Sequence, residues 1–115
     1  MNAETRLDLI SYINDLLVAI KEARFVAIDA GNDKLVDKLK KRRKKLSKLR
    51  DKLIQAQMKD WIDNAEAITE RIKSAEEQTK IAIKELKDDI RNAKKWVVAT
   101  GLIDDAIDLI TSLLP

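Results

Sequence analysis

The chain has no cysteine and no histidine. Without cysteine it has no disulfide framework, and nothing ties the fold to an oxidising compartment. The same two absences exclude the usual zinc sites, imidazole general bases and thiol nucleophiles. The residue types that many enzymes use are therefore missing, and we expect a protein that is not an enzyme and needs no cofactor.

Glycine, proline and aromatic residues are scarce as well. The chain has 2 glycines, 1 proline and 3% aromatic residues, against 45% hydrophobic and 37% charged residues. This composition disfavours turns and strands and favours long helices. The two glycines, at positions 31 and 101, are too far apart to form a phosphate-binding loop. The sequence thus predicts an all-α fold, and its 115 residues fit one domain, 1–115.

Long hydrophobic runs are also absent. The longest uninterrupted one is LLVAI, Leu16–Ile20, far shorter than the roughly 20 residues that a bilayer-spanning helix needs. The first ten residues, MNAETRLDLI, lack the basic start and the cleavage site of a secretory signal. We therefore expect a soluble, cytoplasmic protein with no membrane span.

The few helix-breaking residues predict where helices end. Gly31 and Asn32 follow a periodic apolar run, so we expect one helix at about 3–30 and a second at about 33–58. No glycine or proline lies between Asn32 and Gly101. We place a turn near 57–63, and the sequence leaves open the alternative of one continuous helix from 33 to about 97.

The break at Thr100–Gly101 predicts a third helix at about 61–97 and a short amphipathic one at 103–114. Apolar residues in a 4,3 alternation give each long helix a seam for packing. The seams comprise Leu9, Ile13, Leu16, Ile20, Ala23, Ala27 and Ala30 in the first helix and Leu35, Leu39, Leu46, Leu49, Leu53 and Ala56 in the second. We expect an elongated antiparallel bundle of three long helices and one short helix, with coiled-coil-like packing.

The net charge of +3 conceals an uneven distribution. Residues 34–52 contain 11 basic and 2 acidic residues, a net charge of +9, whereas the rest of the chain carries 12 basic and 18 acidic residues, a net charge of −6. One side of the second helix is a basic stripe of Lys34, Lys38, Lys41, Lys45, Lys48 and Lys52. One edge of the first helix is an acidic stripe of Asp8, Asp15, Glu22 and Asp29. We expect the two stripes to face each other in a helical hairpin.

Six consecutive cations, Lys40–Lys45, surround the whole circumference of a helix, so a single facing helix cannot neutralise all of them. The surface that stays positive is suited to phosphates, by backbone charge alone, because the segment has no aromatic residue for stacking and no base-reading set. The candidate polyanion-binding residues are Lys38, Lys40, Lys41, Arg42, Arg43, Lys44, Lys45, Lys48, Arg50 and Lys52.

Two interpretations are open for each of three single residues. Arg42 interrupts the leucine seam, and we expect it to extend outward to solvent; the alternative is an ion pair with a carboxylate across the interface. Trp61 and Trp96 lie near the two ends of the third predicted helix. We expect each to fill the core or cover a helix end, and the alternative is an exposed binding anchor.

The seams favour a non-enzymatic protein-interaction or scaffolding module that self-associates or binds another helical protein. The first helix has more apolar surface than one neighbouring helix covers. The candidate interface residues are Leu17, Val18, Phe25, Ile107, Ile110 and Leu114. The alternative function is sequence-nonspecific binding of nucleic acid or another polyanion.

A third hypothesis is a magnesium enzyme built on carboxylate pairs that share a helix face, Glu66 with Glu70 and Glu85 with Asp89. Lysines interleave with these acids, which is typical of ordinary surface charge pairing, so we favour that interpretation and expect no metal site.

Overall fold

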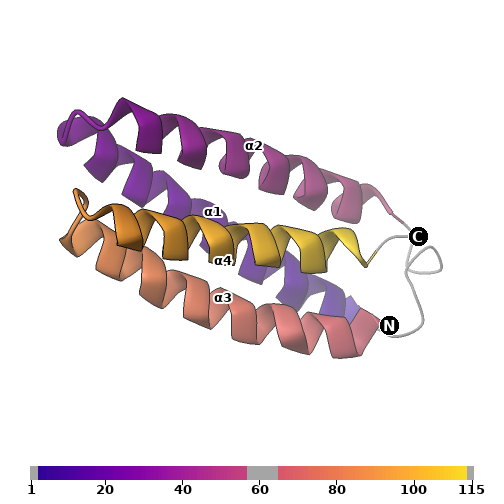
Figure 1. Ribbon diagram of the computed structural model, residues 1–115. Coiled ribbons are helices and arrows are strands. Elements are labelled where there is room, and N and C mark those ends of the chain that lie inside the picture. The colour runs from indigo at the N-terminus through magenta and orange to yellow at the C-terminus, as the bar shows by residue number, and fades with distance from the viewer. Residues whose placement is uncertain (1–2, 57–64, 114–115) are drawn as a thin grey trace.

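The computed structural model describes residues 3–56 and 65–113. They form four helices and no strand: α1 (Ala3–Asp29), α2 (Asp33–Gln55), α3 (Ala65–Asp88) and α4 (Ala93–Thr111). The helices pack into a bundle with principal extents of 45 × 22 × 19 Å (Figure 1). The predicted all-α helical bundle is confirmed. None of the helices in these two ranges has the length and apolar character that crossing a membrane requires.

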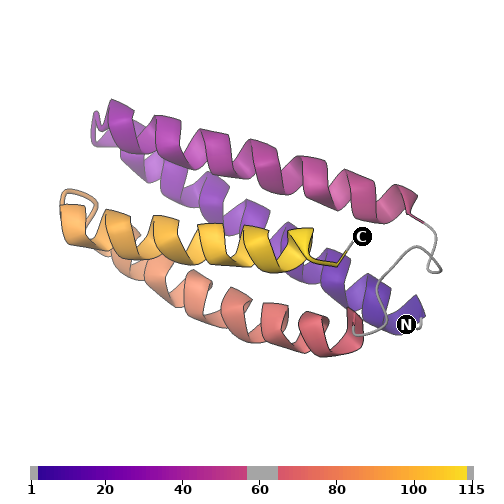
Figure 2. The same cartoon turned by 45° about the vertical axis from the view of Figure 1, so that its right-hand side comes forward.

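The bundle consists of two hairpins, α1–α2 and α3–α4. Consecutive helices run antiparallel, while α1 lies beside α3 and α2 beside α4, and each of these two pairs runs in the same direction (Figures 1 and 2). Glu22 of α1 meets Lys87 of α3 near the C-terminal ends of both helices, which agrees with this direction. The predicted antiparallel packing thus applies within each hairpin, but the contacts between the hairpins are parallel.

The core is built from the predicted seams. The predicted seam residues of α1 and α2 are buried except Ala30, Leu49 and Ala56, which are partly buried. Ile72 and Leu86 of α3 and Ile103 and Ile110 of α4 complete the core and are at most 1% exposed. Burial of such a side chain contributes about 1.5–3 kcal/mol, so the apolar seams supply most of the driving force for packing.

The first turn follows the sequence signals. Gly31 has φ +69°, the left-handed conformation that commonly ends a helix, and it lies two residues after the end of α1 at Asp29. The Oδ1 of Asn32 then accepts a hydrogen bond of 3.2 Å from the backbone N–H of Leu35 and caps α2. The helix end predicted at Gly31–Asn32 is confirmed.

The second turn contradicts the sequence prediction. α3 ends at Asp88, and α4 continues through Thr100 and Gly101 without a break. Asn92 caps α4, because its Oδ1 accepts a hydrogen bond of 3.1 Å from the backbone N–H of Lys94. The prediction was wrong because an exposed glycine costs a helix only about 1 kcal/mol, which the buried face of α4 outweighs. Within residues 3–56 and 65–113 the bundle therefore has four helices of 19 residues or more, instead of three long ones and a short one.

Trp96 covers this second turn. Its indole Nε1 donates a hydrogen bond of 2.5 Å to the carbonyl of Ile90, and the side chain is half-buried. This placement fits the predicted helix-end cover rather than an exposed anchor. Trp61 lies outside the described residues.

α2 and α3 are two separate helices that lie diagonally across the bundle, so the continuous helix from 33 to about 97 does not form. α2 ends at Gln55, a few residues earlier than predicted. Arg6 of α1 donates a hydrogen bond of 3.2 Å to the carbonyl of Leu53 and a second one to the carbonyl of Ile54. A cation therefore satisfies carbonyls at the C-terminal end of α2, where the helix dipole favours positive charge. The predicted turn at 57–63 lies outside the described residues.

Candidate functional site

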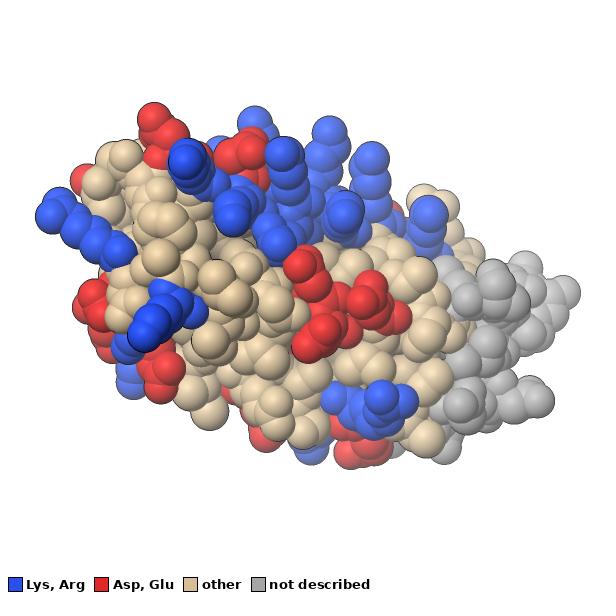
Figure 3. All heavy atoms as spheres, viewed as in Figure 1, with Lys and Arg blue, Asp and Glu red and all other residues tan. Residues whose placement is uncertain are grey.

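α2 carries the most strongly charged surface of the bundle. Lysine and arginine side chains gather over α2, and acidic side chains lie over the neighbouring α4 (Figure 3). Of the ten candidate polyanion-binding residues, the seven lysines are exposed. The arginines at positions 42, 43 and 50 are half-buried, because they lie at the edges where α2 meets its neighbours. The basic side chains of α2 are therefore presented outward along its whole length.

Few of these cations have an ionic partner. Among the 11 basic residues of 34–52, Lys41 pairs with Asp37 at 3.0 Å, Arg42 with Asp104 at 2.9 Å and Arg50 with Asp51 at 3.2 Å. Both carboxylates of the segment are used in these pairs. The other eight cations form no ion pair with any residue of 3–56 or 65–113. Most of the positive charge of α2 is thus free to meet an external anion.

Arg42 connects α2 to α4. Its Nε and a terminal nitrogen bind the two carboxylate oxygens of Asp104 at 2.9 and 3.0 Å, and its other terminal nitrogen donates to the carbonyl of Lys38 at 3.1 Å. The expected outward extension of Arg42 is wrong, and the alternative pairing across the interface is correct. Arg42 and Asp104 thus form a bidentate ion pair, in which the Arg42 side chain is only 21% exposed. This pair fixes the position of α4 along α2.

The predicted match between the basic stripe of α2 and the acidic stripe of α1 does not form. Glu22 of the acidic stripe pairs with Lys87 of α3 at 3.1 Å, and Asp15 lies close enough to Glu76 of α3 to influence its charge. The acidic edge of α1 therefore faces α3. A 4,3 spacing identified the basic stripe and a seven-residue spacing the acidic stripe, but neither spacing showed on which side of the hairpin each stripe lies.

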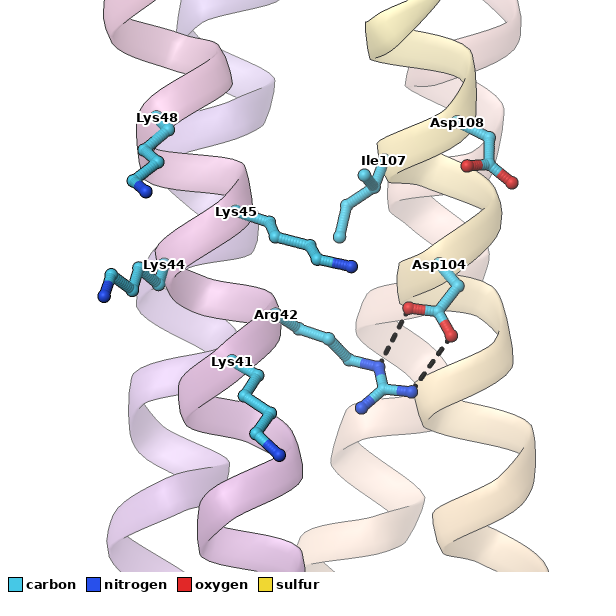
Figure 4. Close-up of a pocket in the computed structure, with 8 residues that line it drawn as sticks. All are labelled: Lys41, Arg42, Lys44, Lys45, Lys48, Asp104, Ile107 and Asp108. Carbon is cyan, nitrogen blue, oxygen red and sulfur yellow. Dashed lines mark hydrogen bonds and ion pairs between the residues drawn. The ribbon is translucent and has the colours of Figure 1, made fainter.

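A groove of about 560 Å³ separates α2 from α4. Arg42 and Lys45 reach toward α4, whereas Lys44 and Lys48 extend away from it (Figure 4). On the α4 side the groove is lined by Asp104, Asp108 and Ile107 (Figure 4). The α2–α4 groove thus has five cations on one wall and two carboxylates on the other, and the carboxylates reduce its attraction for a polyanion.

The groove on the other flank of α2, against α1, has a different lining. It contains two adjoining cavities of about 400 and 320 Å³, which share Arg43 and Ser47. The larger cavity is lined by Arg24, Lys40, Arg43, Lys44, Ser47 and Lys48, and the smaller one by Asn14, Leu17, Val18, Lys21, Arg43, Ser47 and Arg50. No carboxylate lines either cavity, so the α1–α2 groove is the more positive of the two flanks.

Arg24 and Lys21 were missed by the sequence reasoning, because they belong to α1 and lie outside the basic run. The Nε of Arg24 is buried and has no hydrogen-bond partner among the described residues. Buried donors without an acceptor are rare in folded proteins. The sequence alone gives no sign of Arg24, because only the three-dimensional packing places it beside the basic residues of α2.

The candidate protein-interface residues divide into two groups. Leu17, Ile107 and Ile110 are at most 9% exposed and pack in the core of the chain itself, so they offer little surface to a partner, contrary to expectation. Val18 and Phe25 of α1 are 55% and 54% exposed, and the Lys21 ammonium lies 5.8 Å from the centre of the Phe25 ring. Leu114 lies outside the described residues.

The carboxylates considered for a magnesium site do not converge where the structure describes them. Glu70, Glu85 and Asp89 are exposed, the side chain of Glu66 is not described, and residues 3–56 and 65–113 contain no cluster of three metal-ligating side chains. Glu76 is different, since it is only 4% exposed. Burial raises the pKa of its carboxyl, Lys80 at 3.5 Å partly opposes this effect, and Asp15 adds to it. That the chain is not an enzyme stays a prediction.

Comparison of the chain with protein-family models, with curated proteins and with solved structures found no match. The functional argument therefore depends on the geometry and charge of the chain alone.

Proposed function

We propose that the chain binds nucleic acid or a similar polyanion through α2, by contacts to phosphates and without sequence specificity. The observation that carries this proposal is the set of eight cations in 34–52 that form no ion pair with the described residues. Unpaired, exposed cations gain affinity for a polyanion because binding releases the counterions that condense on its phosphates.

The length of α2 suits this role. Its 23 residues extend about 35 Å at 1.5 Å per residue, a distance that covers several phosphates of a duplex. α2 contains no aromatic residue, so base stacking does not contribute to the binding surface. Binding through backbone charge alone predicts similar affinity for different sequences and a steep dependence on salt.

Fluorescence anisotropy with a labelled duplex at several salt concentrations tests the proposal. The test variant replaces Lys40, Lys44, Lys45 and Lys48 by glutamine. These side chains are exposed and have no ion pair in the described part of the chain, so the fold is expected to survive. Removal of four phosphate contacts is expected to reduce the slope of log affinity against log salt by about 3 to 4, and the affinity at low salt on the order of 100-fold.

A matched variant replaces Lys73, Lys84, Lys94 and Lys95, which lie on α3 and α4, by glutamine. It has the same net charge as the test variant, so any difference between them reports where the charge lies. Equal duplex affinity and equal salt slope in the two variants would refute the role of α2.

Self-association through α1 is a second candidate function. Leu7, Val18 and Phe25 are each more than half exposed, and the spacing of 7 residues between Val18 and Phe25 places them on one side of the helix. Light scattering over a range of protein concentrations, at two salt concentrations and with or without a short duplex, separates the two functions. A dimer that is lost in a Val18→Ser, Phe25→Ser variant supports self-association, whereas a monomer that forms a salt-sensitive complex with the duplex supports polyanion binding.

A further inference from the structure

The larger cavity of the α1–α2 groove combines residues from two helices. Arg24 comes from α1, and Lys40, Arg43, Lys44, Ser47 and Lys48 come from three successive turns of α2. Lys44 and Lys48 line the α2–α4 groove as well, although Figure 4 shows their side chains directed away from α4. The cavity volume of about 400 Å³ falls within the roughly 300–1,000 Å³ that is usual for small-ligand sites.

The hydrogen-bond donors of this cavity are unusually free. None of its five cationic residues forms an ion pair with the described part of the chain. The Nε of Arg24 is buried and lacks a partner there. A buried donor without an acceptor destabilises the fold, so Arg24 is held at this cavity at a cost to stability.

The chemistry of the lining favours a phosphate group. Two guanidinium groups present planar pairs of donors, which match the oxygens of a phosphate. Three ammonium groups add charge without fixed geometry, and the Ser47 hydroxyl can donate one more hydrogen bond. With no carboxylate in the lining, no internal anion competes for these donors.

We propose that this cavity is a phosphate-binding site, in which Arg24, Lys40 and Arg43 hold one phosphate group in a defined position. The inference deepens the proposed function and rests on it for nucleic acid, since a backbone phosphate of a duplex bound along α2 is one source of this group. A free oligophosphate is the other source. In both cases the α1–α2 groove binds the phosphate and the α2–α4 groove does not.

Two lysines of α2 provide a matched test. Lys40 lines only the α1–α2 groove and Lys45 lines only the α2–α4 groove, and both are exposed without an ion pair to the described residues. Calorimetric titration of the full chain with inorganic tripolyphosphate is compared for the parent, Lys40→Gln and Lys45→Gln. We expect Lys40→Gln to weaken binding about tenfold and Lys45→Gln less than about twofold.

Arg24→Gln is the second test variant, with circular dichroism to establish that it folds. It is expected to weaken tripolyphosphate binding about tenfold or more, and Arg24→Lys is expected to recover only part of the loss because an ammonium lacks the paired donors. Equal weakening by Lys40→Gln and Lys45→Gln would overturn the site and leave only diffuse attraction.

A parallel titration with a duplex separates this inference from the proposed function. If the duplex binds but Lys40→Gln and Lys45→Gln weaken it equally, the phosphate site is wrong and the function stands. If tripolyphosphate binds with the predicted difference but the duplex does not bind, the site stands as one for free oligophosphates and the proposed function fails.

Discussion

The two hairpins share one architecture and carry opposite surfaces. In each, two antiparallel helices are joined by a short turn, and an asparagine caps the second helix. Yet α2 contains 11 basic and 3 acidic residues, whereas α4 contains 2 basic and 3 acidic residues. The comparison shows that the hairpin backbone depends on its apolar seam and leaves the outer face of the second helix free to vary.

The charges are complementary between the hairpins rather than within them. Glu22 of α1 pairs with Lys87 of α3, and Arg42 of α2 pairs with Asp104 of α4. Each pair joins a half-buried cation to an exposed carboxylate, and surface ion pairs contribute only about 0.2–1 kcal/mol each. Their main effect is therefore selective, because they favour the parallel arrangement of α1 with α3 and of α2 with α4 over other packings of the same hairpins.

The largest expected effect concerns the two glycines, one in each hairpin, which differ in backbone conformation. An added Cβ meets no atom within 4 Å at either position, so backbone conformation alone decides the outcome. Gly31→Ala places a side chain at φ +69° and is expected to destabilise the fold by about 1–2 kcal/mol. Gly101→Ala, inside α4, is expected to stabilise it by about 0.5–1 kcal/mol. Urea unfolding of both variants measures the difference, and a shift of the same sign in both would contradict this account.

A second prediction tests the difference between the two flanks of α2 by removing the carboxylates from one of them. Asp104→Asn combined with Asp108→Asn removes the carboxylates from the α2–α4 groove and frees Arg42. Because repulsion of phosphates on that flank then falls, duplex affinity at low salt is expected to rise about threefold to tenfold. Fluorescence anisotropy measures the change.

The control for this prediction is Asp88→Asn combined with Asp105→Asn, which changes the net charge equally but leaves the lining of the α2–α4 groove intact. An equal gain of affinity in both double variants would mean that net charge, and not the groove, determines binding.

The smallest expected effect concerns Glu76, a buried carboxyl on α3 that has no counterpart among the charged residues of α2. Because burial raises its pKa in the folded state, the fold favours the protonated form, and stability is lost as the pH rises through the carboxyl's range. Glu76→Gln is therefore expected to be more stable than the parent at neutral pH. This advantage should disappear below the ordinary value of 4.5, where Glu76 is protonated in both states.

Thermal unfolding between pH 3 and 8 measures the difference in stability between Glu76→Gln and the parent. The charges of Lys80, Asp15 and Glu77 also affect the pKa of Glu76 and so contribute to this difference. Glu77→Gln removes the same charge from an exposed position. A pH-dependent gain of the same size in both variants would contradict the role of burial.

The sequence predicted the features that local spacing determines. The fold class, the seams of α1 and α2 and the turn at Gly31–Asn32 all follow from periodicity and capping signals within a few residues of each other. The second turn was missed because the apolar spacing continues through it, from Leu86 and Ile90 to Ala93 and Val97. Asn92 was a local sign of a new helix, and a single asparagine is a weak one.

The candidate site was predictable only in part, for the same reason. Its lysines form one run in the sequence, but the residues that distinguish its two flanks come from other helices. Arg24 lies in α1, and Asp104 is 62 residues away from Arg42. Spacing within a helix identifies a charged face, and tertiary packing decides which neighbour that face meets.

The side-by-side arrangement of the hairpins has a consequence for the order of folding. Contacts within a hairpin close short loops, whereas the ion pairs between hairpins join residues 62 and 65 positions apart. Closing longer loops costs more entropy, so each hairpin is expected to collapse first and to dock onto the other in a later step. The ion pairs between the hairpins form only in this docking step. Because salt screens them, a change of salt concentration is expected to alter the free energy of docking and to leave the formation of each hairpin almost unchanged.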